Sequence, residues 1–190
     1  PAKVALEART RPSFFATLSR SWRQLGTRLF EHLLLVLAAV GLATGIAVPA
    51  GLRMASQPSL RAALLALAGV VQTIPSLALL VFLIPLLGLS MWSAIAALFL
   101  YALLPILRNT CTGVLGVPAD LVDAARGMGM RDREILWRVQ LPLALPMILA
   151  GVRTATVISV GFAVLAAFIG AGGLGGFIVD GLALNDMPLL

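Results

Sequence analysis

The chain has 190 residues and a net charge of +6; 60% of its residues are apolar and only 12% are charged. Soluble domains carry about 25% charged residues, so this composition excludes an ordinary soluble domain and indicates a membrane protein. The basic charge does not indicate nucleic-acid binding, because the arginines lie between apolar runs, where membrane proteins place them.

A basic segment, residues 1–29, comes first. Between Phe14 and Leu29 the apolar residues recur at helical spacing, and arginines fill much of the other face. This pattern predicts an amphipathic helix in the membrane interface, and a solvated leader that packs on its neighbours is the alternative. We expect no signal peptide, because residues 1–28 contain no apolar stretch followed by a small-residue cleavage site.

Long runs without a charged residue predict the spans of a single transmembrane domain, residues 30–190. The run Leu33–Leu52 has 20 residues, about one bilayer crossing, and the run Ala62–Leu107 has 46, enough for about two. We therefore expect an all-α membrane protein with four visible spans and the start of a fifth. The four spans are expected at about residues 30–52, 60–88, 91–107 and 143–169.

The first span contains a small-xxx-small pair, Gly41 and Gly45, which permits another helix to approach closely. Pro49 follows in the same run of apolar residues. Because proline removes one helical hydrogen bond and crowds the preceding turn, Pro49 is expected to kink or end this span.

The second and third spans contain candidates for a translocation pathway. Gln72, Thr73 and Ser76 lie beside Pro75, whose ring frees a backbone carbonyl. They are expected either to line a pathway or to form interhelical hydrogen bonds. Tyr101 is a further candidate, because aromatic rings attract quaternary ammonium groups, although we do not expect a complete aromatic cage.

Arg153 is the one charge well inside the fourth span. It lies 11 residues past Pro142, or about 16 Å along a helix. Charges at such depth usually face the bundle interior or a water-filled cavity, so Arg153 is a candidate for the pathway or a gate. Pairing with the loop before this span, or snorkelling to the membrane surface, are the alternatives.

The end of the chain begins with a glycine-rich segment, residues 170–176, where no stable regular helix is expected. Residues 177–190 then predict a short external helix and the approach to a further span. Cys111 and His32 are the single cysteine and the single histidine. They offer neither an intrachain disulfide nor a metal-binding set, so no metal site is expected.

The loop of residues 118–142 is the long polar stretch inside the membrane domain. Pro118 suits the first turn of a short helix, which Gly127 and Gly129 are expected to end. A second helix is predicted from Asp132 to Gln140. Two short amphipathic helices at a bend suit docking into a groove of a partner protein, and an ordinary interfacial loop is the alternative.

The same loop resembles the EAA motif of ABC importer permeases, which reads E-A-A, three residues, G, nine residues, I-x-L-P. Asp123-Ala124-Ala125 takes the first part, Gly129 follows after three residues, and Val139 to Pro142 follows after nine more. Aspartate replaces glutamate and valine replaces isoleucine, and both changes keep the charge or the shape of the side chain.

This resemblance implies that the loop couples the chain to the cytoplasmic ATPase dimer of a type I ABC importer. It implies contacts through Asp123, Ala124, Ala125 and Gly129, with Leu141 and Pro142 closing the motif. Mg-ATP would then belong to the partner, because the single lysine, Lys3, follows no glycine-rich loop. The family also implies a second permease copy or a sister permease, an extracytoplasmic binding protein, and residence in the bacterial inner membrane.

Four further segments resemble permeases for glycine betaine, choline, carnitine and related osmoprotectants, which implies a substrate of that class. The resemblance covers most of the chain between residues 31 and 185. The four segments are residues 71–79, 104–110, 150–154 and 168–175.

The membrane topology contains a conflict. The EAA resemblance places the loop in the cytoplasm, and counting back three spans then places residues 1–28 outside the cell. The positive-inside rule favours the opposite, because six basic residues against Glu7 precede the first span. We follow the count of spans, since the motif defines the side of the loop.

Another small solute is the alternative substrate, and an ion-coupled secondary transporter is the alternative of a different class. Such transporters place Asp, Glu or His inside the membrane. The two charge-free runs contain none of these residues, and the fourth predicted span contains only Arg153. A channel or a membrane enzyme is not supported either, because no filter-like sequence, nucleophile–base pair or metal set is found.

Overall fold

The computed structural model describes the backbone of residues 14–184 and the side chains of residues 22–183, and this part of the chain is helical without a β-strand. The long helices are α2 (Phe14–Ser56), α3 (Pro58–Thr73), α4 (Ser76–Leu87), α5 (Met91–Leu115) and α8 (Leu141–Phe162). The short ones are α6 (Ala119–Gly127), α7 (Asp132–Ile135) and α9 (Gly175–Leu184), with a π-helical turn at Leu136–Gln140 and a 3-10 segment at Ala163–Ile169. The expected all-α fold class is confirmed. Residues 1–13 and the expected approach to a fifth span at 185–190 lie outside the described residues.

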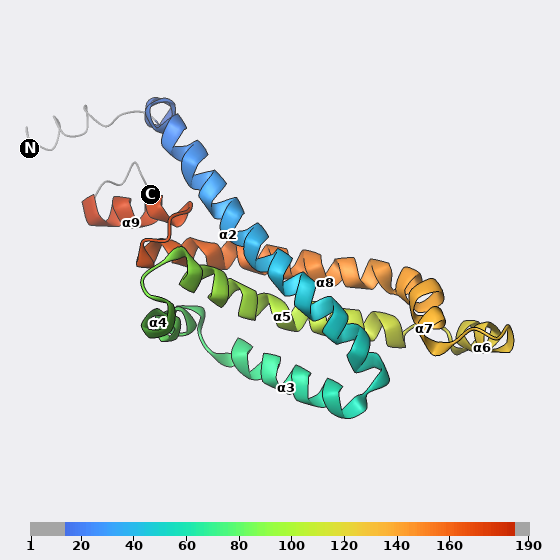
Figure 1. Cartoon of the computed structure of the whole chain (residues 1–190). Coiled ribbons are helices and arrows are strands. Elements are labelled where there is room, and N and C mark those ends of the chain that lie inside the picture. Colours follow the sequence, from blue (N-terminus) through green and yellow to red (C-terminus); the bar gives the residue numbers. More distant parts are fainter. Residues whose placement is uncertain (1–13, 185–190) are drawn as a thin grey trace, which may run out of the picture.

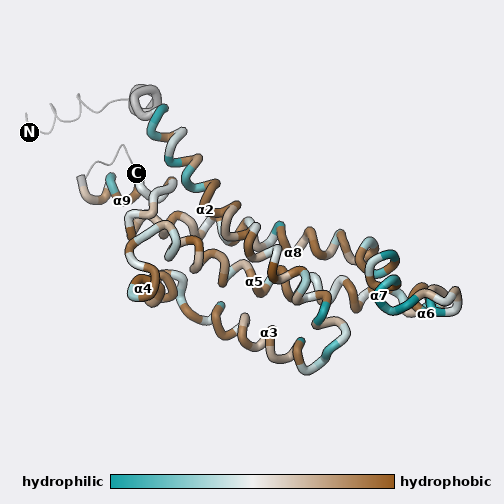
Figure 2. The backbone as a smooth tube through the Cα atoms, in the orientation of Figure 1, coloured by the Kyte–Doolittle hydropathy of each residue, from teal (hydrophilic) through white to brown (hydrophobic). Residues whose placement is uncertain are grey.

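Three helical stretches are long and apolar enough to cross a membrane, at residues 22–56, 91–115 and 132–169. α3 and α4 together pass the same test as a pair bent by 101°. Counted as one crossing, this pair completes the four spans predicted from the sequence. Figure 2 shows the apolar colouring along these helices and the hydrophilic residues gathered at the start of α2 and around α6 and α7.

α2 is one helix of 43 residues that starts at Phe14, so the structure has no break at the expected boundary at residue 30. Residues 14–29 of the basic segment are therefore continuous with the helix of the first span and do not form a separate helix. Leu29 and Phe30 are consecutive, and neither is a glycine or a proline. The local sequence therefore gives no signal that would end the helix there. Pro49 lies inside α2 and does not end it.

The second span is not one straight helix, which corrects the prediction for residues 60–88. α3 ends at Thr73, Ile74 is extended (φ −74°, ψ 127°), and α4 starts at Ser76. The ring of Pro75 disfavours helical dihedrals at the residue before it, so the helix breaks at Ile74. α4 consequently leaves α3 at an angle of 101°.

The helices that contain the other two predicted spans extend beyond residues 91–107 and 143–169. α5 continues past Leu107 to Leu115, and α8 joins α7 through the π-helical turn to form helix from Asp132 onward. In this turn the N–H of Leu141 donates to the carbonyl of Leu136, five residues back. The wider turn directly precedes Pro142, whose ring crowds an ordinary helical turn. The polar loop and the fourth span are therefore one continuous helical stretch.

α2, α5 and α8 form the core of the molecule, and glycines bring them together. A Cβ at Gly51 would lie 2.7 Å from Cβ of Thr110, and one at Gly151 would lie 2.7 Å from Cβ of Asn109. By contrast, a Cβ at Gly41 or Gly45 would meet nothing within 4 Å. The predicted small-xxx-small pair therefore makes no close helix contact within the described part of this chain.

The bundle has two distinct ends, as Figure 1 shows. α6 and α7 protrude at one end, where α2 also finishes, whereas the start of α2 and all of α9 lie at the other. This arrangement agrees with the count of spans that places the start of α2 and the loop of residues 118–142 on opposite sides of the membrane.

Candidate coupling loop and translocation residues

Gly129 gives the end of α6 its shape. Its φ of +81° is in the left-handed region, which glycine adopts without a Cβ penalty. The N–H of Met130 donates to the carbonyl of Ala125 (3.2 Å), and the N–H of Gly129 donates to that of Arg126 (2.9 Å). These two bonds form a Schellman motif, which satisfies carbonyls that a helix end leaves free. The glycine of the motif thus turns the chain sharply from α6 towards α7.

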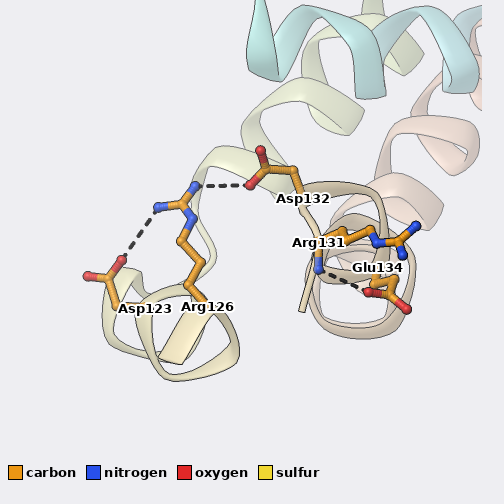
Figure 3. A network of polar contacts seen from close by, with 5 residues as sticks. All are labelled: Asp123, Arg126, Arg131, Asp132 and Glu134. Atoms are coloured by element: carbon orange, nitrogen blue, oxygen red, sulfur yellow. Dashed lines mark hydrogen bonds and ion pairs between the residues drawn. The ribbon is translucent and has the colours of Figure 1, made fainter. Parts of the chain in front are cut away.

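Arg126 connects the two sides of this turn, as Figure 3 shows. Its guanidinium lies 3.6 Å from a carboxylate oxygen of Asp123 on α6 and 3.5 Å from one of Asp132 at the start of α7. The N–H of Arg131 donates to the carboxylate of Glu134 (2.9 Å), half of a capping box for α7. Sequence reasoning missed Arg126, although its spacing of three residues from Asp123 was a usable signal.

α6 presents one face to its own chain and another to solvent. Ala125 is only 1% exposed, and Val122 beside it is half-buried. Leu121 and Met128 are exposed, Met128 to 75%, and Ala124 lies with them on the outer side. We define the α6 stripe as Leu121, Ala124 and Met128. Ala125 packs inside the chain and so offers little surface for the expected partner contact, whereas Asp123, Ala124 and Gly129 are exposed.

Leu141 and Pro142 lie away from the α6 stripe. Leu141 is half-buried and packs on a small apolar cluster with Val114, Ala144 and Ile148, and Pro142 follows the π-helical turn. Both residues lie at the start of α8, directly after the π-helical turn that joins it to α7. These last two residues of the motif therefore shape the helix that carries the loop.

Two of the pathway candidates, Gln72 and Tyr101, join α5 to α3 and to the break that follows it. The side-chain amide of Gln72 donates to the backbone carbonyl of Tyr101 (3.0 Å), and the hydroxyl of Tyr101 donates to the carbonyl of Ile74. The ring of Tyr101 also meets Phe162 edge-on, with 4.9 Å between the centroids. These contacts correspond to the interhelical alternative that the sequence left open.

Thr73 and Ser76 flank the break between α3 and α4. The hydroxyl of Thr73 donates to the carbonyl of Val70 (2.7 Å) and its side chain is exposed. Ser76 lines a cavity of about 20 Å³ together with Tyr101 and Phe162. Because one water needs roughly 10–15 Å³ by this kind of measure, the cavity holds about one water and no organic solute.

Arg153 is exposed on α8, and the described residues give it no ion-pair partner. Its neighbours Gly151 and Ala155 are buried against the core. The arginine therefore points away from the core of this subunit. Among the described residues, no group of three or more His, Cys, Asp and Glu side chains is placed to hold a metal ion.

The chain resembles known transport proteins. Residues 44–190 match the family described as "Binding-protein-dependent transport system inner membrane component". The chain is 46% identical over 161 residues to the carnitine transport permease protein OpuCB of Listeria monocytogenes, an alignment of 85% of this chain and 74% of that protein. It is 48% identical over 154 residues to the glycine betaine/carnitine/choline transport system permease protein OpuCB of Bacillus subtilis (strain 168), covering 81% and 71%.

A solved structure supports the fold. A chain of the MetNI methionine ABC transporter, solved in inward facing conformations, superposes with a TM-score of 0.75 over 90% of this chain and 86% of that one, at 23% identity. The family match at residues 44–190 includes the loop of residues 118–142 and the helices on both sides of it. The chain therefore belongs to the family of binding-protein-dependent transport system inner membrane components, and it is a multi-pass inner-membrane permease with an ABC transporter fold.

Proposed function

We propose that this chain is the membrane permease of an ATP-driven importer for glycine betaine, choline, carnitine or related quaternary ammonium osmolytes. The observation that carries the proposal is the identity of 46–48% to relatives named for transport of these compounds. At such identity over more than four fifths of this chain, the relatives' substrate class is the first to test.

The coupling site of this function is the α6 stripe with Asp123 and Gly129. Three apolar side chains on the exposed side of a short helix suit a groove on another protein, as amphipathic helices dock through one face. The partner is a cytoplasmic ATPase dimer that binds and hydrolyses Mg-ATP. A second permease copy or a sister permease, and an extracytoplasmic binding protein, complete the importer.

The translocation pathway runs past Arg153, Thr73 and Ser76 in this proposal. A charge on a membrane-spanning helix normally faces protein or water, and Arg153 is exposed on α8 and points out of its own bundle core. The cavity beside Ser76 is too small for an osmolyte, so passage of the solute requires α4 or α8 to move.

The test is uptake of labelled glycine betaine, choline and carnitine at high salt in cells that lack their own osmolyte importers. The cells express this permease with its binding protein and ATPase. Ala124→Arg adds a charged side chain to the α6 stripe. Ala119→Arg is the matched control, because Ala119 is exposed on α6 but lies roughly 140–180° around the helix from the α6 stripe.

We expect Ala124→Arg, and deletion of residues 123–129, to abolish both uptake and co-purification of the ATPase while the permease still inserts. Ala119→Arg should keep both. Normal uptake after the deletion would refute the coupling role. ATP-dependent uptake of a different solute only would replace the substrate class, and uptake that needs an ion gradient but no ATPase would favour an ion-coupled secondary transporter.

A further inference from the structure

A cavity of about 550 Å³ lies between the start of α2 and α9. Both helices are at the end of the bundle opposite α6 (Figure 1). The volume is within the range of about 300–1,000 Å³ that small-molecule sites occupy. The lining comes from α2, from the end of the 3-10 segment with the glycines after it, and from α9. None of the coupling or pathway candidates lines this cavity, so its polar residues need a separate explanation.

The walls of the cavity are joined by polar contacts between α2 and the last part of the chain. Arg28 on α2 pairs with the carboxylate of Asp180 on α9 at 2.7 Å. The carboxylate of Glu31, also on α2, accepts a hydrogen bond from the N–H of Gly173 (3.0 Å). Both α2 side chains are half-buried. Because these groups satisfy one another, the cavity keeps its shape without a ligand.

Two further contacts bring α2 close to the opposite wall. Nε2 of His32 lies 3.0 Å from the carbonyl of Val160 on α8. A Cβ at Gly176 would lie 1.2 Å from the guanidinium of Arg28, so only glycine permits this approach of α9 to α2. The cavity is therefore bordered on both sides by helices that are held at short distance.

Four charged side chains line the cavity, and two of them remain available to a ligand. Arg28 and Glu31 are occupied by the contacts above. Arg23 is exposed and has no ion-pair partner among the described residues, and the carboxylate-bearing side chain of Asp180 is still 48% exposed. The cavity thus offers a guanidinium to an anionic group and a carboxylate to a cationic one. This charge pattern is complementary to a zwitterion.

The position of the cavity along α2 indicates where such a zwitterion comes from. Trp22, which is 68% exposed, directly precedes the lining residues, and the charge-free run of the first span begins at Leu33. Exposed tryptophans gather at the level of the lipid headgroups, and a charge-free run of 20 residues crosses the hydrocarbon core. Residues 23–31 lie between these two markers, so the cavity is at headgroup level.

The side of α2 that borders the cavity continues into the hydrocarbon region as an exposed apolar strip. Leu34, Gly41 and Gly45 follow Thr27 and Glu31 at spacings of three, four or seven residues, which places them on the same side of the helix. All three are exposed, and a Cβ at either glycine would meet nothing within 4 Å. We call Leu34, Gly41 and Gly45 the α2 strip. It leaves room for an acyl chain directly beneath the polar cavity.

We propose that this cavity binds the headgroup of a zwitterionic phospholipid, phosphatidylethanolamine, with one acyl chain along the α2 strip. The phosphate binds the guanidinium of Arg23, whose planar fork matches phosphate oxygens. The ammonium group donates to the carboxylate of Asp180. A phosphate partner also gives Arg23 a role on the side of the membrane where the positive-inside rule disfavours basic residues. The inference goes beyond the proposed transport function and does not depend on it.

The test is native mass spectrometry of the full-length permease in detergent, titrated with four probes. Phosphatidylethanolamine carries every feature that the site would recognise. Phosphatidylglycerol with the same acyl chains lacks the ammonium group, and diacylglycerol lacks the whole phosphate headgroup. Glycerophosphoethanolamine carries the headgroup without the acyl chains. Comparison of the four separates the contributions of phosphate, ammonium and acyl chain.

We expect phosphatidylethanolamine to bind the wild-type permease about tenfold or more tightly than each of the other three probes. Arg23→Gln should raise its dissociation constant about tenfold, because one charge-assisted contact to phosphate is lost. Arg53→Gln is the matched control and should stay within about twofold of wild type. Arg53 is exposed near the other end of α2 and likewise has no ion-pair partner among the described residues.

Asp180 should decide between the two phospholipids. Asp180→Asn removes the partner of the ammonium group and releases Arg28, so the preference for phosphatidylethanolamine over phosphatidylglycerol should disappear or reverse. Asp180→Glu keeps the carboxylate and should keep the preference. Thermal unfolding of each variant without added lipid shows whether α9 has loosened, and a preference lost equally in Asp180→Glu and Asp180→Asn would overturn the role of the carboxylate.

Three other results would overturn the lipid site. Equal affinity of wild type and Arg23→Gln for phosphatidylethanolamine would show that the phosphate does not bind Arg23. Equal binding of all three lipids would show an ordinary lipid shell without headgroup recognition. Glycerophosphoethanolamine that binds as tightly as the lipid would make a soluble zwitterion the ligand. Since none of these measurements involves transport, failure of the lipid site and failure of the proposed function are distinguishable.

Discussion

The side-chain amide of Gln72 on α3 donates a 3.0 Å hydrogen bond to the backbone carbonyl of Tyr101 on α5. That carbonyl lacks its usual helical donor, because the residue four positions on is Pro105, which has no N–H. The Tyr101 hydroxyl in turn donates to the carbonyl of Ile74, at the break before Pro75. Pro105 thus leaves the Tyr101 carbonyl without a helical donor, the helix break at Ile74 leaves the carbonyl of Ile74 outside a helix, and one pair of side chains satisfies both.

Replacing Gln72 with leucine removes the donor for the Tyr101 carbonyl. We expect a loss of about 1 kcal/mol in stability, the usual size for an interhelical hydrogen bond in a membrane protein, with the substrate KM unchanged. Thermal unfolding in detergent and uptake kinetics measure the two quantities. A raised KM with unchanged stability would show that Gln72 contacts substrate instead.

Tyr101→Phe provides the second arm of a double-mutant cycle. Because both side chains fasten the α3–α4 break to α5, we expect the double variant to lose less stability than the sum of the two single variants. Additive losses would mean that the two hydrogen bonds act independently.

Substitutions at Gly129 should separate backbone strain from steric contact. A Cβ here meets nothing within 4 Å in its own chain, but φ is +81°, a conformation that costs an L residue about 1–2 kcal/mol. Gly129→Val should therefore weaken ATPase association by about tenfold or more, whereas Gly129→Asn should keep most of it, because asparagine tolerates left-handed dihedrals. Co-purification titrations with the ATPase measure this; equal affinity of the two variants would contradict the role of the Schellman turn.

Alanine at two glycines should have opposite effects on stability. At Gly151 the new methyl would lie 2.7 Å from Cβ of Asn109 and 3.0 Å from the carbonyl of Pro105, so α8 must move from α5 at a cost of about 1–3 kcal/mol. At Gly41 the methyl meets no atom within 4 Å, and the higher helix propensity of alanine should stabilise α2 by about 0.5–1 kcal/mol. Thermal unfolding of the isolated permease in detergent measures both. A loss at Gly41 comparable to that at Gly151 would reveal a helix partner outside this subunit.

Arg126→Ala should weaken ATPase association more at low salt than at high salt. The ion pairs of Arg126 with Asp123 and Asp132 join side chains that are 59–88% exposed, so each contributes about 0.2–1 kcal/mol and is screened by salt. The affinity difference from wild type should shrink between about 0.05 and 0.5 M NaCl. Arg138→Ala, which removes an exposed charge without a partner among the described residues, is the control. An Arg126→Ala defect that is the same at every salt concentration would rule out an electrostatic role.

The sequence alone determined the class of this protein and the position of its candidate coupling loop. Runs of 20 and 46 residues without a charge indicate membrane spans, because a charge inside the bilayer would have to be desolvated. The spacing from Asp123 through Gly129 to Pro142 is local, and the turn that Gly129 makes depends on its own φ and on bonds within five residues.

Only the tertiary structure decided where helix α2 starts, by what angle the second span bends and which polar residues contact one another. The break at Pro75 was visible as a proline, but its angle of 101° and the hydrogen bond that Tyr101 of α5 donates at the break are seen only in the folded chain. The partners of Arg28, Glu31 and His32 lie 128–152 residues away in sequence. No local pattern encodes such pairs, because they form only when packed helices bring distant segments together and exclude the water that would otherwise solvate them.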